Sequence, residues 1–268
     1  GLPPDLLETE IKGDETPVTK ADHESERIIS EALLSAFSDI GLVREEGENI
    51  EVSGERPMCL IDPLDGTSSF FRGIPTYAIL AALADRHDGK PRVTACVVYE
   101  PQTHRLWSAV RGAGAFLARR TPGEAVLGEQ HRLRVSSRAF FPADKAMIIY
   151  DAALRFRDVV PTIPDKASAL ASVLPLFRRG RMIGSLALQC AYVASGFAEA
   201  TVMDAVGGPY DLCGHLLVDE AEGSSSDLAG SPINIFETKI AIATNGDRHQ
   251  ELAQCVSEAY KRFSPYAE

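Results

Sequence analysis

The sequence predicts an α/β fold in which helices and sheets are stacked in layers, and three observations lead to that prediction. A chain of 268 residues with 45% hydrophobic residues is long enough to bury substantial cores. Segments with helical periodicity alternate with short apolar runs along the chain. The apolar runs of the first half predict antiparallel hairpins, whereas those of the second half predict mixed strands, which together indicate a layered sandwich.

The first half is expected to contain one long helix and several strands. Residues 2–20 are polar, and Asp22 is a suitable N-cap for a helix with an apolar face formed by Ile28, Ile29, Leu33 and Phe37. Apolar runs predict strands at 58–61, 77–84, 92–99 and 105–110, and the last two form a hairpin about a turn at 101–104. We expect a tight turn at 112–116 and a joining loop over 121–134.

The second half is expected to alternate strands with helices. Strands are predicted at 146–150, 199–203 and 240–244. Helices are predicted at 166–177 with a solvated arginine-rich end, at 186–195, from Asp211 onward, and at 247–263. We therefore expect an N-terminal subdomain, residues 1–140, and a C-terminal subdomain, residues 141–268, with a site that draws on both.

Composition restricts the class of partner and the cellular compartment. The formal net charge of −11 makes a nucleic-acid polymer or an anionic membrane a poor main partner. No apolar run approaches membrane-spanning length, and no signal-peptide pattern opens the chain. The five cysteines are scattered without a C-x-x-C pair, which is typical of free thiols in the cytoplasm. The chain begins with Gly1, so what lies upstream, a leading helix included, stays open.

The stretch 61–69, Ile-Asp-Pro-Leu-Asp-Gly-Thr-Ser-Ser, is the strongest candidate for a functional site. Asp62 and Asp65 follow a buried strand, and Gly66 lets backbone N–H groups approach an anion. This combination indicates a metal-assisted phosphate site, and Mg²⁺ prefers such oxygen ligands. Asp-Pro and Asp-Gly are also common turn formers, so each acid taken alone is more simply a turn residue or a helix cap.

Taken together, the motifs resemble the inositol monophosphatase family. Residues 62–70 resemble its first signature, D-P-[IL]-D-G-T-[TS]-N-F, and residues 208–214 with 220–223 resemble its second, W-D-x-A-A-G followed by E-A-G-G. The stretches 44–46, 19–22 and 184–185 fit the family in the same order. The resemblance implies a layered α-β-α-β-α sandwich of the inositol monophosphatase and fructose-bisphosphatase type.

Carried over by position, the resemblance implies a role for each motif residue. Two or three Mg²⁺ ions would be bound by Glu45, Asp62, the carbonyl of Leu64, Asp65 and Asp211. Thr67, held near Asp22, would act with Glu45 in catalysis by orienting and activating the attacking water. The phosphate would be held by Gly66, Thr67 and Ser68, and the rest of the substrate by Gly184, Ser185 and Asp204.

These residue types suit phosphate ester hydrolysis. The uncatalysed reaction is extremely slow, so large electrostatic stabilisation is needed, and two cations ~3.5–4 Å apart can clamp the attacking and leaving oxygens. A metal-activated water attacks in line without a histidine or cysteine nucleophile. We therefore expect a Mg²⁺-dependent, lithium-sensitive phosphatase that hydrolyses a small sugar- or polyol-type phosphate monoester, and we expect a homodimer.

The sequence leaves the substrate open. Ser69, Tyr210 and Gln189 depart from the usual family residues, so inositol, sugar, histidinol and nucleotide phosphates all remain candidates. A nucleotide phosphatase, acting on AMP-like or 3′,5′-bisphosphate nucleotides, or a sugar bisphosphatase is the alternative on the same fold. A non-catalytic regulatory or scaffold protein is a further alternative. Haloacid-dehalogenase-type phosphatases use Asp-x-Asp, whereas two residues separate Asp62 from Asp65 here. The number of metal ions and the oligomeric state are likewise not fixed by the sequence.

Overall fold

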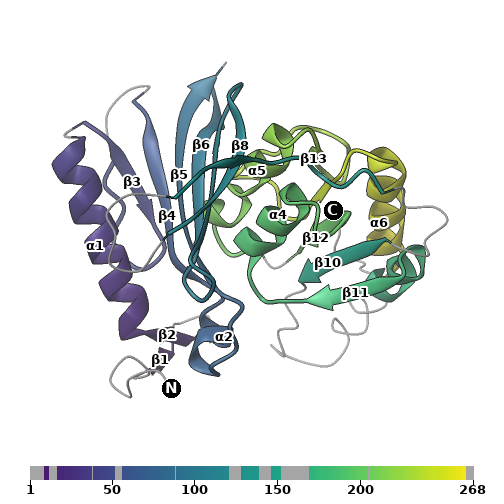
Figure 1. Ribbon diagram of the computed structural model, residues 1–268, viewed down its shortest axis with the longest axis horizontal. Coiled ribbons are helices and arrows are strands. Elements are labelled where there is room, and N and C mark those ends of the chain that lie inside the picture. Colours follow the sequence, from purple (N-terminus) through teal and green to yellow (C-terminus); the bar gives the residue numbers. More distant parts are fainter. Residues whose placement is uncertain are drawn as a thin grey trace.

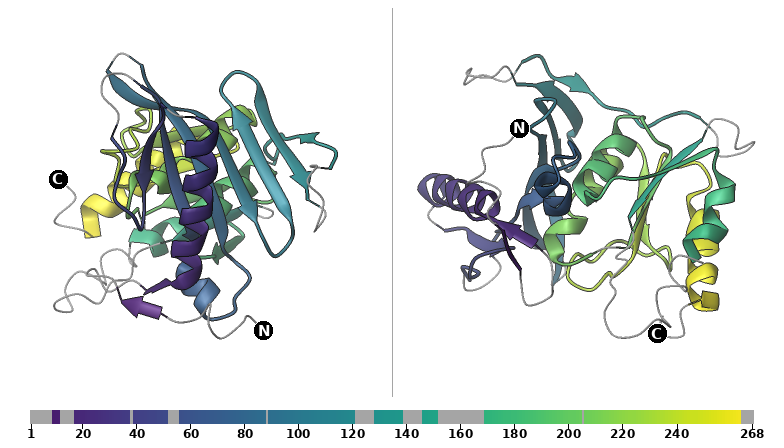
Figure 2. Two further views of the ribbon diagram at one scale, coloured as in Figure 1. Left: turned by 90° about the vertical axis from the view of Figure 1, so that its left-hand side faces the viewer. Right: turned by 90° about the horizontal axis from the view of Figure 1, so that it is seen from below.

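Two large sheets and three layers of helices build the protein. The computed structural model describes residues 9–11, 17–37, 39–51, 56–87, 89–120, 128–138, 146–151, 169–204 and 206–263. The layers follow the order helix α1, a seven-stranded sheet, helices α4 and α5, a five-stranded sheet, and helix α6 (Figure 1). The same order is visible from below in the right-hand view of Figure 2. The predicted α-β-α-β-α sandwich is confirmed.

The seven-stranded sheet is formed by residues of the first half. Its strands lie in the order β3 (Gly41–Arg44), β4 (Met58–Asp65), β5 (Ala78–His87), β6 (Lys90–Glu100), β7 (Arg105–Val110), β8 (Gly114–Arg119) and β9 (His131–Arg132). Strands β3 and β4 are parallel, and the other neighbours are antiparallel. The predicted strands and the hairpin at 101–104 are confirmed. The predicted turn at 112–116 is shorter, because strand β8 already begins at Gly114.

The five-stranded sheet is formed by residues of the second half. Its strands lie in the order β11 (Arg179–Met182), β10 (Met147–Asp151), β12 (Ala200–Met203), β14 (Ala241–Thr244) and β13 (Ser224–Asp227). Strands β10, β11 and β12 are parallel, and β14 runs against both β12 and β13. The prediction for the arginines at 178–181 was wrong, because they lie on and beside edge strand β11 rather than at a helix end.

The helices differ from the prediction mainly at their ends. They are α1 (Lys20–Ala36), α2 (Thr67–Phe71), α4 (Leu186–Ala194), α5 (His215–Glu220) and α6 (His249–Phe263), with 3-10 turns η2 (Leu174–Leu176) and η3 (Pro209–Leu212). Strands β1 (Thr9–Ile11) and β2 (Pro17–Thr19) form a small hairpin before α1. The helix expected at Asp211 begins at His215, because Asp211 lies in the 3-10 turn η3. The helix expected at 166–177 falls partly outside the described residues.

Helix α4 fills the centre of the molecule, between the two sheets. Eight of its nine residues are buried, which is typical of a helix covered on all sides. The fully buried Trp107 of β7 reaches it, and its indole N–H donates to Ser195 Oγ at 2.8 Å. Among the described residues, no helix is both long and apolar enough to span a membrane.

Helix α1 turns both polar and apolar residues inward, so the predicted apolar face is confirmed only in part. Ile29 and Leu33 pack against buried residues of β3 and β4, whereas Ile28 and Phe37 are 53% and 58% exposed. Its most deeply buried residues are polar, namely Asp22, Glu26 and Ser30. Thr19, not Asp22, is the N-cap, and Asp22 completes a capping box with it. The inward face of α1 therefore carries hydrogen-bonding groups toward the end of the adjoining strand β4.

Candidate active site

Asp62 and Asp65 lie at the end of strand β4, where its pairing with β5 becomes irregular. Asp62 is opposite Leu80 and Asp65 is opposite Ala78, so the register shifts between them. In a regular strand, residues three apart project from opposite faces. The irregularity relaxes that alternation, and Leu64 N–H donates to Asp62 Oδ1 at 3.1 Å. Both aspartates are buried.

Asp65 is held by the start of helix α4. Its carboxylate accepts from Ser185 Oγ at 2.6 Å, from Ala187 N–H at 2.7 Å and from Leu186 N–H at 3.2 Å. Ser185 is also the N-cap of α4, since its Oγ accepts from Leu188 N–H. Carboxylates are stabilised at helix N-termini. Asp65 thus joins the seven-stranded sheet to the central helix layer.

The backbone between Asp65 and α2 requires a glycine. Gly66 has φ 96°, and a Cβ at this position would lie 2.8 Å from the carbonyl oxygen of Thr76 and 3.0 Å from that of Gly184. Both the left-handed conformation and the lack of space exclude other residues. Gly184, one of the predicted substrate-binding residues, is therefore brought against the Asp65-Gly66 turn. The predicted phosphate-binding segment, Gly66 to Ser68, forms the first residues of α2.

The predicted contact between Thr67 and Asp22 is present. Thr67 Oγ1 lies 3.0 Å from Asp22 Oδ1 and 3.0 Å from the carbonyl oxygen of Leu64. The other oxygen of Asp22 accepts from the backbone N–H of Thr19 at 2.8 Å. Asp22 is therefore both part of the cap of α1 and a hydrogen-bond acceptor for Thr67, which fixes the orientation of this hydroxyl.

Glu45 and Asp211 approach Asp62 from two other segments. Glu45 directly follows β3, which pairs with β4 up to Arg44 and Ile61. Asp211 lies in η3, where its Oδ2 accepts from Gly207 N–H at 2.5 Å and Gly208 N–H at 2.9 Å. The structure brings both acids into electrostatic contact with Asp62, as its pKa indicates.

Burial and mutual repulsion change the protonation of the site. Burial raises the pKa of Asp62 well above its ordinary value, and the carboxylates of Glu45, Asp65 and Asp211 raise it further. Burial raises the pKa of Asp65 to about 7, which Asp211 reinforces and the hydrogen bond from Ser185 opposes. Four acids from distant parts of the sequence therefore repel one another at one place.

The donor set of this group fits Mg²⁺. Carboxylate and carbonyl oxygens are its preferred protein ligands, and buried like charges favour either protons or a cation among them. Within the described ranges, no three His, Cys, Asp or Glu side chains are already arranged as a metal cage. The four carboxylates thus lie near one another, since Glu45, Asp65 and Asp211 all raise the pKa of Asp62, but they do not have the geometry of a closed metal cage.

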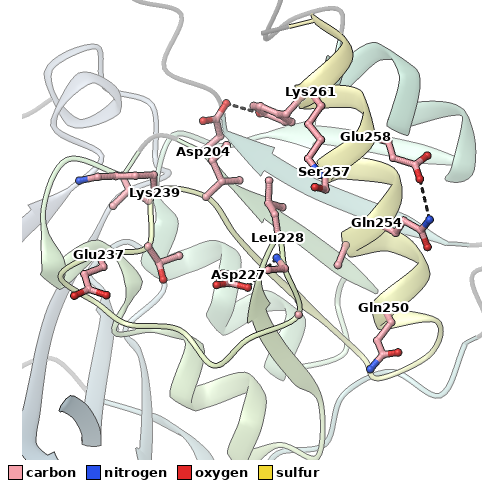
Figure 3. Close-up of a pocket in the computed structure, with 17 residues that line it drawn as sticks. Asp204, Asp227, Leu228, Glu237, Lys239, Gln250, Gln254, Ser257, Glu258 and Lys261 are labelled. Atoms are coloured by element: carbon pink, nitrogen blue, oxygen red, sulfur yellow. Dashed lines mark hydrogen bonds between the residues drawn. The ribbon is translucent and has the colours of Figure 1, made fainter. Parts of the chain in front are cut away.

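Asp204 faces a different neighbour. It follows β12, is buried, and accepts a hydrogen bond from the hydroxyl of Tyr260 on α6. It also lines a groove of about 1120 Å³ between α6, β13 and residues 237–240 (Figure 3). Neither Asp62 nor Asp65 belongs to the lining of this groove. In this structure, therefore, Asp204 is directed toward α6.

Three residues near the site were missed or underrated from the sequence. Glu26 accepts from the backbone N–H of Glu46 at 2.8 Å, and Ser25 Oγ donates to the carbonyl oxygen of Pro63 at 2.8 Å. Burial and the carboxylates of the site raise the pKa of Tyr210, which places its hydroxyl near them. The one sequence signal for Glu26 was its position four residues after Asp22, on the same helix face.

Comparison with known proteins gives first the class and then the family. The fold is similar to the crystal structure of extragenic suppressor protein suhB from Bartonella henselae, with TM-score 0.77 and 31% identity over 93% of this chain and 89% of that one. It is also similar to the Thermotoga maritima IMPase, with TM-score 0.76 and 29% identity over 96% and 90% of the two chains. These likenesses define a layered α/β phosphatase fold.

The family is shown by the sequence matches. The model of the inositol monophosphatase family matches residues 4–261, and the chain belongs to this family of phosphatases. An inositol-1-monophosphatase of Rhizobium meliloti strain 1021 is 32% identical over 224 residues, which are 84% of this chain and 77% of the relative. The Nus factor SuhB of Escherichia coli K12 is 30% identical over 228 residues, 85% and 78% of the two chains.

The raised pKa values predict how stability depends on pH in protein freed of divalent cations. The folded state holds a proton on Asp65 up to about pH 7, whereas an unfolded aspartate releases it near 3.8. This contribution is therefore fully present at low pH and is lost as the pH rises through 7. Asp62 is shifted in the same direction. We expect the free energy of unfolding in EDTA to fall from pH 5 to pH 8, by at most ~3 kcal/mol from Asp65, because only about two pH units of that range lie below its raised pKa.

Thermal and urea unfolding at pH 5, 6, 7 and 8 measure this slope. Asp62→Asn should flatten it, because one of the shifted carboxyls is removed. Saturating Mg²⁺ should stabilise the protein most at pH 8, since cations bind the deprotonated acids. A metal-free stability that rises over this range equally in both proteins contradicts the electrostatic account.

Proposed function

We propose that the protein is a Mg²⁺-dependent phosphatase that hydrolyses a small sugar- or polyol-type phosphate monoester. The observation that carries the proposal is the convergence of four acids at one place: Asp62 and Asp65 are buried at the end of β4, and Glu45 and Asp211 lie close enough to raise the pKa of Asp62. Membership of a phosphatase family supports the same reaction class. Two buried carboxylates beside two partly buried ones are difficult to explain as packing alone, because like charges destabilise one another away from water.

We assign the cation ligands to Glu45, Asp62, Asp65 and Asp211, together with the carbonyl oxygen of Leu64. Bound there, Mg²⁺ ions supply positive charge that offsets the charge of the phosphoryl group and lowers the pKa of water. The fold itself contributes by holding these oxygens beside the Gly66 turn, where the phosphate ester would bind.

Thr67 and Asp22 act on the attacking water in this proposal. Asp22 Oδ1 is an acceptor for the Thr67 hydroxyl at 3.0 Å. When the hydroxyl proton points to Asp22, the remaining lone pairs of Thr67 Oγ1 are free to accept a hydrogen bond from the water. The backbone N–H groups of residues 66–68 donate to the phosphate oxygens at the start of α2. Such fixed groups contribute by orientation and by electrostatic stabilisation.

The segment before α4 lies beside the Asp65-Gly66 turn, so we place the hydroxyl-bearing part of the substrate toward Gly184 and Ser185. Asp204 was expected from the sequence to contribute there, but it faces Tyr260 and a groove whose lining contains none of the four acids, so we leave it out of the substrate site. We rank bisphosphates and nucleotides below polyol phosphates, because the similar protein of Rhizobium meliloti is named an inositol-1-monophosphatase.

A screen of phosphate release tests the function directly. Purified protein with Mg²⁺ should release inorganic phosphate from inositol and sugar monophosphates, and faster than from histidinol phosphate, AMP, adenosine 3′,5′-bisphosphate or fructose 1,6-bisphosphate. The readout is kcat/KM for each ester. Preference for a nucleotide would favour the alternative that the protein is a nucleotide phosphatase. If no ester released phosphate, the proposal that the protein is an enzyme would be contradicted.

Asp62→Asn should reduce Mg²⁺-dependent phosphate release by at least ~100-fold, because the loss of one preorganised charged group in an active site has an effect of this size. Asparagine keeps the shape of the side chain, so the far-UV circular dichroism spectrum should be unchanged. Asp227→Asn is the matched control, since Asp227 lies in β13 and accepts from Ala229 and Ser231 N–H instead. Activity retained in Asp62→Asn would refute its assignment as a ligand.

Lithium should inhibit the reaction. Li⁺ is a small hard cation that binds the same oxygen ligands, but it carries half the charge of Mg²⁺ and stabilises a phosphoryl group less. Initial rates at a fixed ester concentration should fall with LiCl and not with equal NaCl. Equal responses to the two salts would argue against a Mg²⁺ position accessible to Li⁺.

A regulatory role is the second candidate, and the name of the Escherichia coli relative, Nus factor SuhB, is the observation that favours it. Such a role does not require Glu45, Asp62, Asp65 and Asp211 to be coupled, so we rank it below catalysis. The Asp62→Asn variant separates the two, because binding of a partner protein should survive this substitution while phosphate release should not.

A further inference from the structure

We propose that Glu26 is a positioning residue that fixes Glu45 for the divalent cation, an inference that rests on the proposed function. The side chain of Glu26 points inward from α1, and the residue is only 4% exposed. Its Oε2 accepts from the backbone N–H of Glu46, twenty residues further along the chain, at 2.8 Å. A buried carboxylate is costly unless it is hydrogen-bonded, and a bond from an N–H to a charged acceptor is among the stronger ones.

This contact fixes the backbone on one side of Glu45, and the sheet fixes it on the other. Arg44 pairs with Ile61 in the parallel ladder of β3 and β4, and its N–H donates to Asn49 Oδ1 at 2.9 Å. Glu46 is bound by Glu26. Glu45 therefore lies between two anchored residues, which limits where its carboxylate can be placed relative to Asp62.

The turn packs directly against the carboxylate of Glu26. A Cβ added to Gly47 would lie 2.7 Å from Glu26 Oε1 and 2.9 Å from Arg44 Cζ. One oxygen of Glu26 thus accepts from the N–H of Glu46, and the other lies close to the next residue, Gly47. The turn after β3 therefore packs directly on the Glu26 carboxylate.

Glu26 belongs to a set of contacts from one face of α1. Asp22 accepts from Thr67, Ser25 donates to the carbonyl of Pro63, and Glu26 accepts from Glu46. Residues three and four apart share a helix face, so one turn of helix reaches three separate segments of the site.

Metal binding in the absence of substrate tests the inference. The probe is Mn²⁺, followed by the loss of its free electron paramagnetic resonance signal on titration into metal-free protein. Glu26→Ala should weaken Mn²⁺ binding ~10–100-fold, the usual effect of losing a group that orients a ligand. Glu26→Gln keeps an acceptor oxygen and should bind more tightly than Glu26→Ala. Glu31→Ala is the control, because Glu31 pairs with Arg27 on the exposed face of the same helix.

The role of Glu26 is distinguished from a general effect on folding by two further measurements. At saturating Mn²⁺, KM for the phosphate ester should be unchanged in Glu26→Ala. Gly47→Ala adds a methyl group that overlaps Glu26 Oε1, so the carboxylate and the turn must move apart, and the substitution should weaken Mn²⁺ binding in the same direction. Wild-type affinity in both variants, or equal losses in Glu26→Ala and Glu26→Gln, overturns the inference while leaving the proposed function standing. Failure of the wild type to bind Mn²⁺ overturns both.

Discussion

The site depends on the carboxylate of Asp65 being bound by the first turn of helix α4. Three donors from residues 185–187 converge on this one side chain. The donors offset the cost of burying a charge and fix the end of β4 against the central helix layer. Gly66 can then approach Gly184 more closely than any other residue could. The spacing between the two sheets is thereby set at the place where the acids meet.

The two helix layers beside the seven-stranded sheet have opposite characters, and the site explains the difference. Helix α4 lies between the sheets and is mostly apolar, and it contributes to the site the hydroxyl of its N-cap Ser185 and the backbone N–H groups of its first turn. Helix α1 covers the outer face and presents Asp22, Ser25 and Glu26 to the loops that follow β3 and β4. Helix α4 packs between the sheets and binds Asp65 at its N-terminus, whereas α1 makes side-chain hydrogen bonds to the segments of the site.

Much of this arrangement could be predicted because its signals are local. Local residues mark where the elements begin and end: an apolar run precedes Asp62, a glycine follows Asp65, and a serine precedes α4. The family resemblance then places these residues in one site. The contact between Thr67 and Asp22 was also expected. By contrast, strands β11 and β13 have the sequences Arg-Gly-Arg-Met and Ser-Ser-Ser-Asp, which carry no apolar alternation. Their pairing is decided by neighbouring strands, which local patterns do not contain.

Other differences arise where one side chain has competing roles. Asp22 suits an N-cap, but Thr19 takes that place and leaves Asp22 for Thr67. Asp211 resembles the start of a helix, yet its carboxylate closes a turn on Gly207 and Gly208, and α5 starts later. The inward direction of Glu26 had only one weak signal in the sequence, its spacing from Asp22, because glutamate side chains usually remain in water. The hydrogen-bond partner of Asp204 was not predicted either, because it is Tyr260 of α6, which is far along the chain.

The bond between Asp65 and α4 also means that the acids cannot be assembled from the first half of the chain alone. A fragment ending before residue 138 would retain Glu45, Asp62 and Asp65, but Asp65 would lose every donor that the later residues provide. Its charge would then be solvated rather than oriented, and the fourth acid would be missing. Two fragments divided near residue 138 would bring the four acids together only by binding each other, so their association would restore the raised pKa of Asp62.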